Sequence, residues 1–112
     1  MAGTYIPERG DLVWMEFTPH SGHEQSGRRP AIVLSPRSYN SASSLALLCP
    51  ITSKVKGHPF EVELPNELPV KGAVLTDQVK SVDWRARFAK FISHAPKTVV
   101  AEVQAKVRTL ID

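Results

Sequence analysis

The sequence predicts a mostly β protein, a small and strongly curved antiparallel sheet or barrel that ends in one α-helix. Short apolar runs alternate with Pro and Gly breaks, and the hydrophobic period becomes helical only near the end of the chain. The 112 residues allow one core, which at this size buries about two-thirds of the surface of the unfolded chain. We therefore expect residues 1–112 to form a single domain.

The first three strands are predicted from runs of β-forming residues. Residues 10–17 follow a turn signal and are rich in β-formers. Residues 30–36 and 44–51 are continuous apolar runs, as expected of strands that are buried on both faces. Residues 35–44 between them are polar, so we expect a loop with at most one helical turn.

The later elements follow from changes of period. Residues 59–64 alternate strictly, which predicts a strand with Val62 inward and with Glu61 and Glu63 outward. Residues 73–80 and 84–92 are expected to form two short strands, and the second would place Arg85 and Arg87 on one face of the sheet. From Pro96 onward, apolar residues recur at helical spacing, so an amphipathic helix closes the chain.

Composition indicates a soluble protein of the cytoplasm with an anionic partner. The net charge is +3, and the basic excess gathers between Lys80 and Lys97, which favours a polyanion or an acidic protein. Cys49 is the only cysteine and lies among apolar neighbours, so no intrachain disulfide is possible and a nucleophilic role is not expected. The N-terminus lacks a signal-like apolar stretch, and no segment is long enough to span a membrane.

One loop carries an unusual density of functional side chains. His23, Glu24, Gln25, Arg28 and Arg29 stand immediately before the apolar run of residues 30–36. Binding and catalytic residues are often found on loops that a rigid strand holds. The four histidines of the chain show no paired zinc-site spacing, so we expect no metal and no cofactor.

A site with these side chains and no metal ion suits the cleavage of RNA. RNA carries its own nucleophile, the 2′-hydroxyl, so a protein need only orient it, move protons and stabilise the charge on the phosphorane. Arg29 has the planar fork that matches phosphate oxygens. Glu24 and His23 supply an acid, a base or an orienting group in the same loop.

Two further segments extend this candidate site. The loop after residues 44–51 presents Thr52, Ser53 and Lys54, which suit phosphate contacts. If this strand pairs antiparallel with residues 30–36, Arg29 and Thr52 meet at one end of the sheet. Asp77 and Gln78 interrupt an apolar strand, which is costly unless they face a groove or satisfy buried backbone groups.

Each residue also has a structural explanation. Glu24 and Arg29 could form a surface ion pair of little energetic value, and Thr52 could satisfy a strand end. Asp77 is more readily explained as a buried structural carboxylate than as a general base. Trp14 and Trp84 are expected in the core or at a dimer contact.

The chain resembles the MazF/PemK family of toxins from bacterial toxin-antitoxin systems. The resemblance is carried, in order, by "RGDLVW", "GHEQSGRRPAIVLSP", "PITSKVKGHPFEV" and "TDQVKS" followed by "DWRAR". It implies an SH3-like barrel that forms a homodimer and cuts single-stranded RNA at a short sequence without metal. The cut would proceed through 2′-hydroxyl attack and leave a 2′,3′-cyclic phosphate and a 5′-hydroxyl. A cognate acidic antitoxin would neutralise the toxin.

The resemblance also assigns roles by motif position. Arg29 matches the essential arginine, Thr52 the threonine that assists at the phosphate, and Glu24 a loop glutamate that is important for activity. The remaining predicted RNA contacts are His23, Gln25, Arg28, Ser53, Lys54, Asp77, Gln78 and Arg87. Asp77 matches an aspartate of the PemK pattern, but Leu75, two residues before it, stands where that pattern has an arginine. Asp77 is therefore interpreted as a structural or base-contacting residue.

Two alternatives stay open at this point. A non-catalytic poison of gyrase, similar to CcdB toxins, would share the fold, but those toxins use a C-terminal tripeptide with tryptophan and this chain ends Leu110, Ile111, Asp112. An RNA-binding barrel without catalysis would use Thr52 and Arg29 only to anchor phosphates. Single-turnover cleavage separates both from a ribonuclease.

Overall fold

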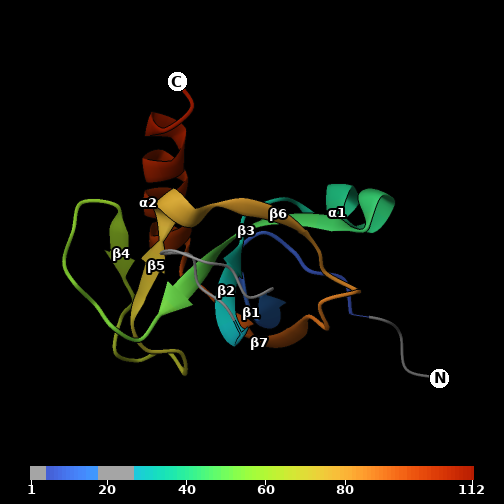
Figure 1. Cartoon of the computed structure of the whole chain (residues 1–112), viewed down its shortest axis with the longest axis horizontal. Helices are drawn as coiled ribbons and strands as arrows, with labels where there is room; N and C mark the ends of the chain where they lie inside the picture. Colours follow the sequence, from blue (N-terminus) through green and yellow to red (C-terminus); the bar gives the residue numbers. More distant parts are fainter. Residues whose placement is uncertain (1–4, 18–26) are drawn as a thin grey trace.

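A computed structural model describes residues 5–17 and 27–112, and its elements are labelled in Figure 1. Their bounds are β1 (Asp11–Phe17), β2 (Gly27–Val33), α1 (Arg37–Ser43), β3 (Leu45–Thr52), β4 (Glu61–Glu63), β5 (Ala73–Leu75), the 3-10 helix η1 (Thr76–Gln78), β6 (Lys80–Asp83), β7 (Lys90–His94) and α2 (Lys97–Thr109).

The strands form one antiparallel sheet in the order β4-β5-β3-β2-β1-β7. Strand β3 lies at its centre: β2 pairs with it at Leu48–Pro50, β6 pairs with Leu45–Leu48, and β5 pairs with Ile51 and Thr52. No pairing joins β4 to β7 among the described residues, so the barrel is open. The predicted mostly β fold with a terminal helix is confirmed.

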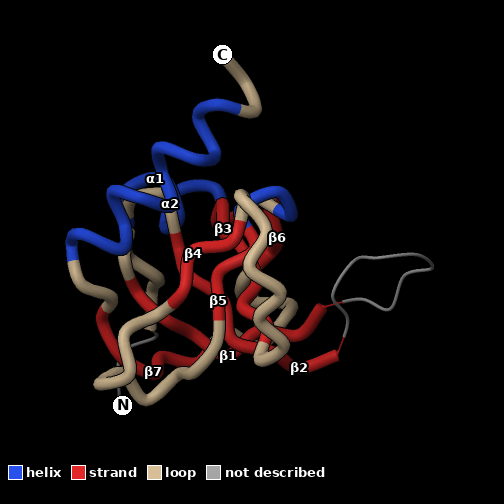
Figure 2. Tube along the Cα trace, turned by 90° about the vertical axis from the view of Figure 1, so that its left-hand side faces the viewer, coloured by secondary structure: helices blue, strands red, loops and turns tan. Residues whose placement is uncertain are grey.

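Two hydrophobic clusters cover opposite faces of the strands. Leu12, Ile32 and Ile51 pack with Val99 and Val103 of α2. The alternate residues of the same strands form the second cluster, which comprises Val13, Met15, Phe17, Ala31, Val33, Ala46, Leu48, Val82 and Trp84. Both helices lie in the upper part of Figure 2, above most of the strands. The ends of β2 and β3 that pair with each other are therefore buried on both faces, as their apolar runs predict, whereas Leu45 and Leu47 at the start of β3 are each 37% exposed.

The polar stretch of residues 35–44 forms the short helix α1 rather than an open loop. Asn40 is fully buried and its Nδ2 donates to the carbonyl oxygens of Pro7 and Ser35, at 2.8 and 3.0 Å. The Nε1 of Trp84 donates to the carbonyl oxygen of Asn40 at 3.0 Å. These bonds satisfy buried polar groups and fix α1 against the sheet.

Two predicted strands are partly wrong. The predicted strand 73–80 ends at Leu75 and gives way to η1, and a new strand, β6, begins at Lys80. Residues 84–88 form turns instead of a strand, and the next strand begins at Lys90. Strand β2 also begins three residues earlier than residues 30–36 predict, because its pairing with β1 extends back to Gly27.

In the part of the chain that the structure describes, no helix is long and apolar enough to cross a membrane.

Candidate functional site

Arg29 and Thr52 lie on neighbouring strands near one end of the sheet. In the pairing of β1 with β2, Arg29 stands opposite Met15. The pairing of β2 with β3 runs from Val33 opposite Leu48 to Ala31 opposite Pro50, so Arg29 and Thr52 each lie two residues beyond its last pair. Strands β2 and β3 thus have the antiparallel pairing that the sequence predicts.

Thr52 is fixed at the end of β3. Its side chain is 6% exposed, and its Oγ1 accepts a hydrogen bond from the backbone N–H of Lys54 at 3.1 Å. A hydroxyl has one proton to donate in addition to its acceptor sites. The Thr52 hydroxyl can therefore accept the Lys54 N–H at the strand end and donate its own proton to a ligand.

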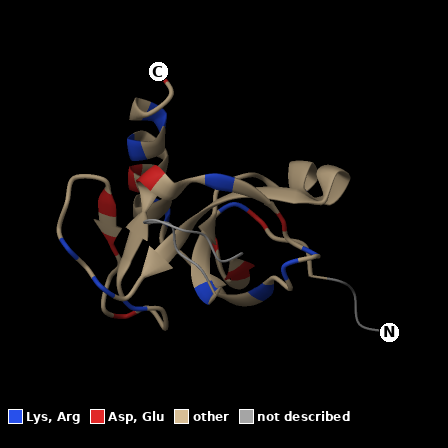
Figure 3. Cartoon of the chain, viewed as in Figure 1, with Lys and Arg blue, Asp and Glu red and all other residues tan. Residues whose placement is uncertain are grey.

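Thr52 borders a cavity of about 270 Å³. The residues that line it come from the end of β3, the β3–β4 loop, β4, β5 and η1: Thr52, Lys54, Lys56, His58, Glu61, Leu75, Asp77 and Gln78. Basic segments follow this loop and acidic ones lie on β4 in Figure 3. The cavity combines ammonium groups with a threonine hydroxyl, a donor set that suits phosphate oxygens.

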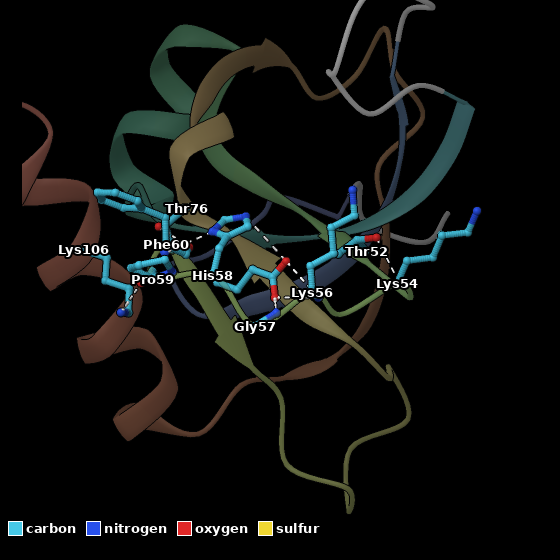
Figure 4. A network of polar contacts seen from close by, with 10 residues as sticks. Thr52, Lys54, Lys56, Gly57, His58, Pro59, Phe60, Thr76 and Lys106 are labelled. Atoms are coloured by element: carbon cyan, nitrogen blue, oxygen red, sulfur yellow. Dashed lines mark hydrogen bonds and ion pairs between the residues drawn. The ribbon is translucent and has the colours of Figure 1, made fainter.

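Glu61 is a site residue that the sequence did not predict. It lies on the face away from the core, as expected, but its side chain is only 4% exposed because the loop at residues 56–58 covers it. Its Oε1 accepts from the backbone N–H groups of Lys56 at 3.0 Å and Gly57 at 2.8 Å, as drawn in Figure 4. Strict alternation identifies the core face of a strand but cannot show that a loop folds over the other face.

Arg29 lines a second cavity of about 320 Å³ on the neighbouring surface. The other lining residues are Trp14, Arg28, Pro30, Ile51, Ser53, Pro69, Val70, Lys71 and Ile92. The structure therefore places Arg29 and Thr52 on paired strands but in the walls of two different cavities. Ser53 lines the same cavity as Arg29, and Lys54 lines the same cavity as Thr52.

Arg28 and Arg87 come together beside the end of β1. Arg28 pairs with Glu16 at 3.5 Å, and its guanidinium lies 3.4 Å from the carbonyl oxygen of Phe88. The Nη1 of Arg87 donates to the carbonyl oxygen of Glu16 at 3.2 Å. Arg87 and Arg85 are not on one face of a strand, since both belong to the turn at residues 84–88. Arg85 instead lies over the ring of Trp84, at 4.8 Å.

Asp77 and Gln78 face the cavity, as one of the two sequence explanations requires. The expectation of a buried Asp77 is wrong, because the residue is exposed on η1. Its charge still reaches the core: burial, with a smaller contribution from Asp77, raises the pKa of the Cys49 thiol to about 12. Cys49 therefore stays a protonated thiol at neutral pH, consistent with the small core residue that the sequence predicts.

The predicted residues His23, Glu24 and Gln25 lie outside the described residues. Within residues 5–17 and 27–112, no three His, Cys, Asp or Glu side chains are grouped to hold a metal ion. The expectation of a mechanism without metal or cofactor stays a prediction.

The sequence of the chain matches a known protein family over residues 8–111. The family is described as the PemK-like, MazF-like toxin of type II toxin-antitoxin systems. The chain belongs to this family.

Named relatives of the PemK/MazF family align along nearly the whole chain. The endoribonuclease toxin MazF of Escherichia coli K12 is 43% identical over 111 residues, which cover 99% of both chains. The endoribonuclease PemK of Escherichia coli is 31% identical over 108 residues, covering 93% of this chain and 81% of PemK.

Solved structures of the family share the fold. MazF of Deinococcus radiodurans superposes with a TM-score of 0.93 at 53% identity, and the match covers 96% of this chain and 98% of that one. A MazE–MazF structure from the same organism gives a TM-score of 0.88 at 53% identity, covering 96% and 97%. The open sheet with its terminal helix is thus the fold of solved PemK/MazF structures.

Proposed function

We propose that this chain is an endoribonuclease toxin that cuts single-stranded RNA at a short recognition sequence without a metal ion. The placement of Arg29 and Thr52 on paired strands, each in the wall of a cavity, carries the proposal. The relatives named endoribonuclease toxin MazF and endoribonuclease PemK support it. The toxin would act in the cytoplasm as a homodimer.

The reaction needs no nucleophile from the protein. The 2′-oxygen forms a bond to phosphorus, the bond from phosphorus to the 5′-oxygen breaks, and the products carry a 2′,3′-cyclic phosphate and a 5′-hydroxyl. One proton leaves the 2′-hydroxyl and one reaches the departing 5′-oxygen. Charge builds up on the non-bridging oxygens in between, so groups that bind those oxygens lower the barrier.

Arg29 and Thr52 would serve the phosphorane. The guanidinium of Arg29 stays charged and can donate two parallel hydrogen bonds to phosphate oxygens. The Thr52 oxygen accepts the hydrogen bond from the Lys54 N–H, so the hydroxyl proton is available for another phosphate oxygen. Glu24 would accept the 2′-hydroxyl proton or orient the hydroxyl.

The surrounding polar residues would hold the RNA strand. Lys54 lines the cavity beside Thr52, Ser53 lines the cavity that contains Arg29, and both suit backbone phosphates. Asp77 and Gln78 face the cavity from η1, where a carboxylate and an amide can read base edges. The other proposed RNA contacts are His23, Gln25, Arg28 and Arg87.

An acidic antitoxin of the MazE type is the proposed protein partner. MazE–MazF structures from Deinococcus radiodurans resemble this chain at 48–53% identity. The chain carries a net charge of +3, and a basic surface attracts an acidic partner at long range. Binding of the antitoxin would block access to the RNA site.

Cleavage of RNA beside matched DNA tests the proposal. We expect the purified protein, in excess chelator, to cut a long single-stranded RNA at discrete sites and to leave DNA of the same sequence intact. Sequencing maps the cuts, and phosphatase sensitivity before and after acid opening identifies cyclic phosphate ends. Cutting of the DNA, or loss of RNA cutting in chelator, would contradict the mechanism. An intact RNA would instead favour a binding toxin.

A further inference from the structure

A carboxylate that the proposed reaction does not use lies buried in the wall of the Thr52 cavity. The Glu61 side chain is 4% exposed, whereas Glu63, two residues further along the same strand, is exposed. A buried carboxylate costs free energy unless hydrogen bonds or a charge partner compensate it. Glu61 therefore needs a structural or functional reason for its position.

Glu61 binds the loop that crosses over it. Its Oε1 accepts from the N–H groups of Lys56 and Gly57, at 3.0 and 2.8 Å, and its Oε2 lies 3.5 Å from the Nε2 of His58. The Nδ1 of His58 accepts from the N–H of Phe60 at 3.2 Å, so the ring proton lies on Nε2 and points at Glu61. Figure 4 labels the loop residues Lys56, Gly57 and His58 that take part in these contacts.

The far end of the loop is fixed independently. The Nζ of Lys106 on α2 donates to the carbonyl oxygen of Pro59 at 2.5 Å, and the Oγ1 of Thr76 donates to that of Phe60 at 2.5 Å. The near end is fixed by the bond between Lys54 N–H and Thr52 Oγ1. Glu61 is thus the contact that determines the path of the middle of the loop, at residues 56–58.

The loop between β3 and β4 carries positive charge to the cavity. Lys54 and Lys56 are exposed and both line the cavity beside Thr52. Within the described parts of the chain, no ion pair engages the ammonium group of either lysine. Because Glu61 contacts the backbone N–H of Lys56 rather than its side chain, that ammonium group stays available for a ligand.

We propose that Glu61 is a positioning residue for RNA binding, whose carboxylate holds the loop at residues 56–58 so that Lys56 faces the phosphates of a strand bound at Thr52. The inference rests on the proposed ribonuclease function and adds to it a device that prepares the phosphate-binding loop in advance. A preordered loop does not have to be ordered when RNA binds, so its order increases affinity.

Three variants test this role. In Glu61→Ala the acceptors are lost, whereas Glu61→Gln keeps one carbonyl oxygen for the amides and should rescue part of the effect. Glu63→Ala, on the exposed face of the same strand, is the matched control. Each protein is assayed with an RNA oligonucleotide that contains the sequence cut by the wild type, over a series of salt concentrations, together with a melting curve.

We expect Glu61→Ala to raise KM about tenfold, from the loss of charge-assisted contacts to phosphate, with kcat changed less than about threefold. The slope of log KM against log salt should fall by about 1, because one phosphate fewer is neutralised. Glu61→Gln should lie between the alanine variant and the wild type, and Glu63→Ala should match the wild type in both KM and slope.

Two results would overturn the inference. One is a Glu61→Ala protein with the KM and the salt slope of the wild type. The other is a fall in melting temperature and in kcat together, with an unchanged salt slope, which would make Glu61 a stability residue only. If the wild type itself cuts no RNA, the proposed function fails and the inference fails with it.

Discussion

Thr52 shows how one side chain can serve both the fold and a reaction. Its oxygen accepts the N–H of Lys54 at the end of β3, and its hydroxyl group borders the cavity. A buried hydroxyl that caps a strand end contributes about 1 kcal/mol to stability. A donor placed where charge develops in a transition state is worth about a hundredfold or more in rate. Loss of the hydroxyl should therefore have a small effect on stability and a large effect on the cleavage rate.

Thr52→Val separates these roles, because it keeps the shape and removes the hydroxyl. We expect single-turnover cleavage to fall about a hundredfold, while the free energy of unfolding falls by only about 1 kcal/mol. Thr52→Ser keeps a hydroxyl at this position and should retain most of the activity. A valine variant that cuts within about threefold of the wild type would remove Thr52 from the reaction.

At the scale of elements, the junction of β5 with β3 positions Thr52. Gly72 lies just before β5 with φ of 121°, and Ala73 pairs with Thr52. A Cβ on Gly72 would stand 1.9 Å from the carbonyl oxygen of Thr52 and 2.8 Å from its carbonyl carbon. Both neighbours are backbone atoms, so the strands themselves would have to move apart.

Gly72→Ala should therefore lower the free energy of unfolding by about 3 kcal/mol or more, from strain at positive φ together with the clash. Gly57→Ala is the matched control: its φ is 79°, and nothing lies within 4 Å of the added Cβ. It should cost only about 1 kcal/mol. Denaturant unfolding of both variants checks the pair, and equal losses would contradict the close approach of Gly72 to Thr52.

The elements also show where sequence reasoning reaches its limit. Apolar runs predicted β1 and β3, and the antiparallel pairing of β2 with β3 was also expected. The alternation of Trp84, Ala86 and Phe88 imitates a strand, yet Phe88 is 69% exposed with φ of 56°. Asp83 explains the difference, because its Oδ1 accepts the N–H groups of Arg85 at 3.1 Å and Ala86 at 2.9 Å and starts a turn.

Glu61 was missed for a related reason. Period-two alternation tells which side of a strand faces the core, and Val62 is buried as predicted. It carries no information about a loop that covers the opposite side. The acidic residue shortly after Gly57 was the available signal, since a glycine turn with free N–H groups needs an acceptor.

At the scale of the whole molecule, the sheet order gives Arg29 a rigid setting. Strand β2 is flanked by β1 and β3, and its residues Ala31, Ile32 and Val33 are fully buried. Arg29 stands at the partly exposed end of this strand. The core that holds it in place does not include its own side chain, so its removal should leave the fold intact.

Arg29→Ala in single-turnover RNA cleavage is the most direct test of the account, with Arg108→Ala on the exposed side of α2 as control. We predict that Arg29→Ala lowers the cleavage rate by about a thousandfold or more, because it removes the main positive charge at the phosphorane. Its melting temperature should stay within about 3 °C of the wild type, and Arg108→Ala should cut normally. An Arg29→Ala protein that melts and cuts as the wild type does would contradict the central claim.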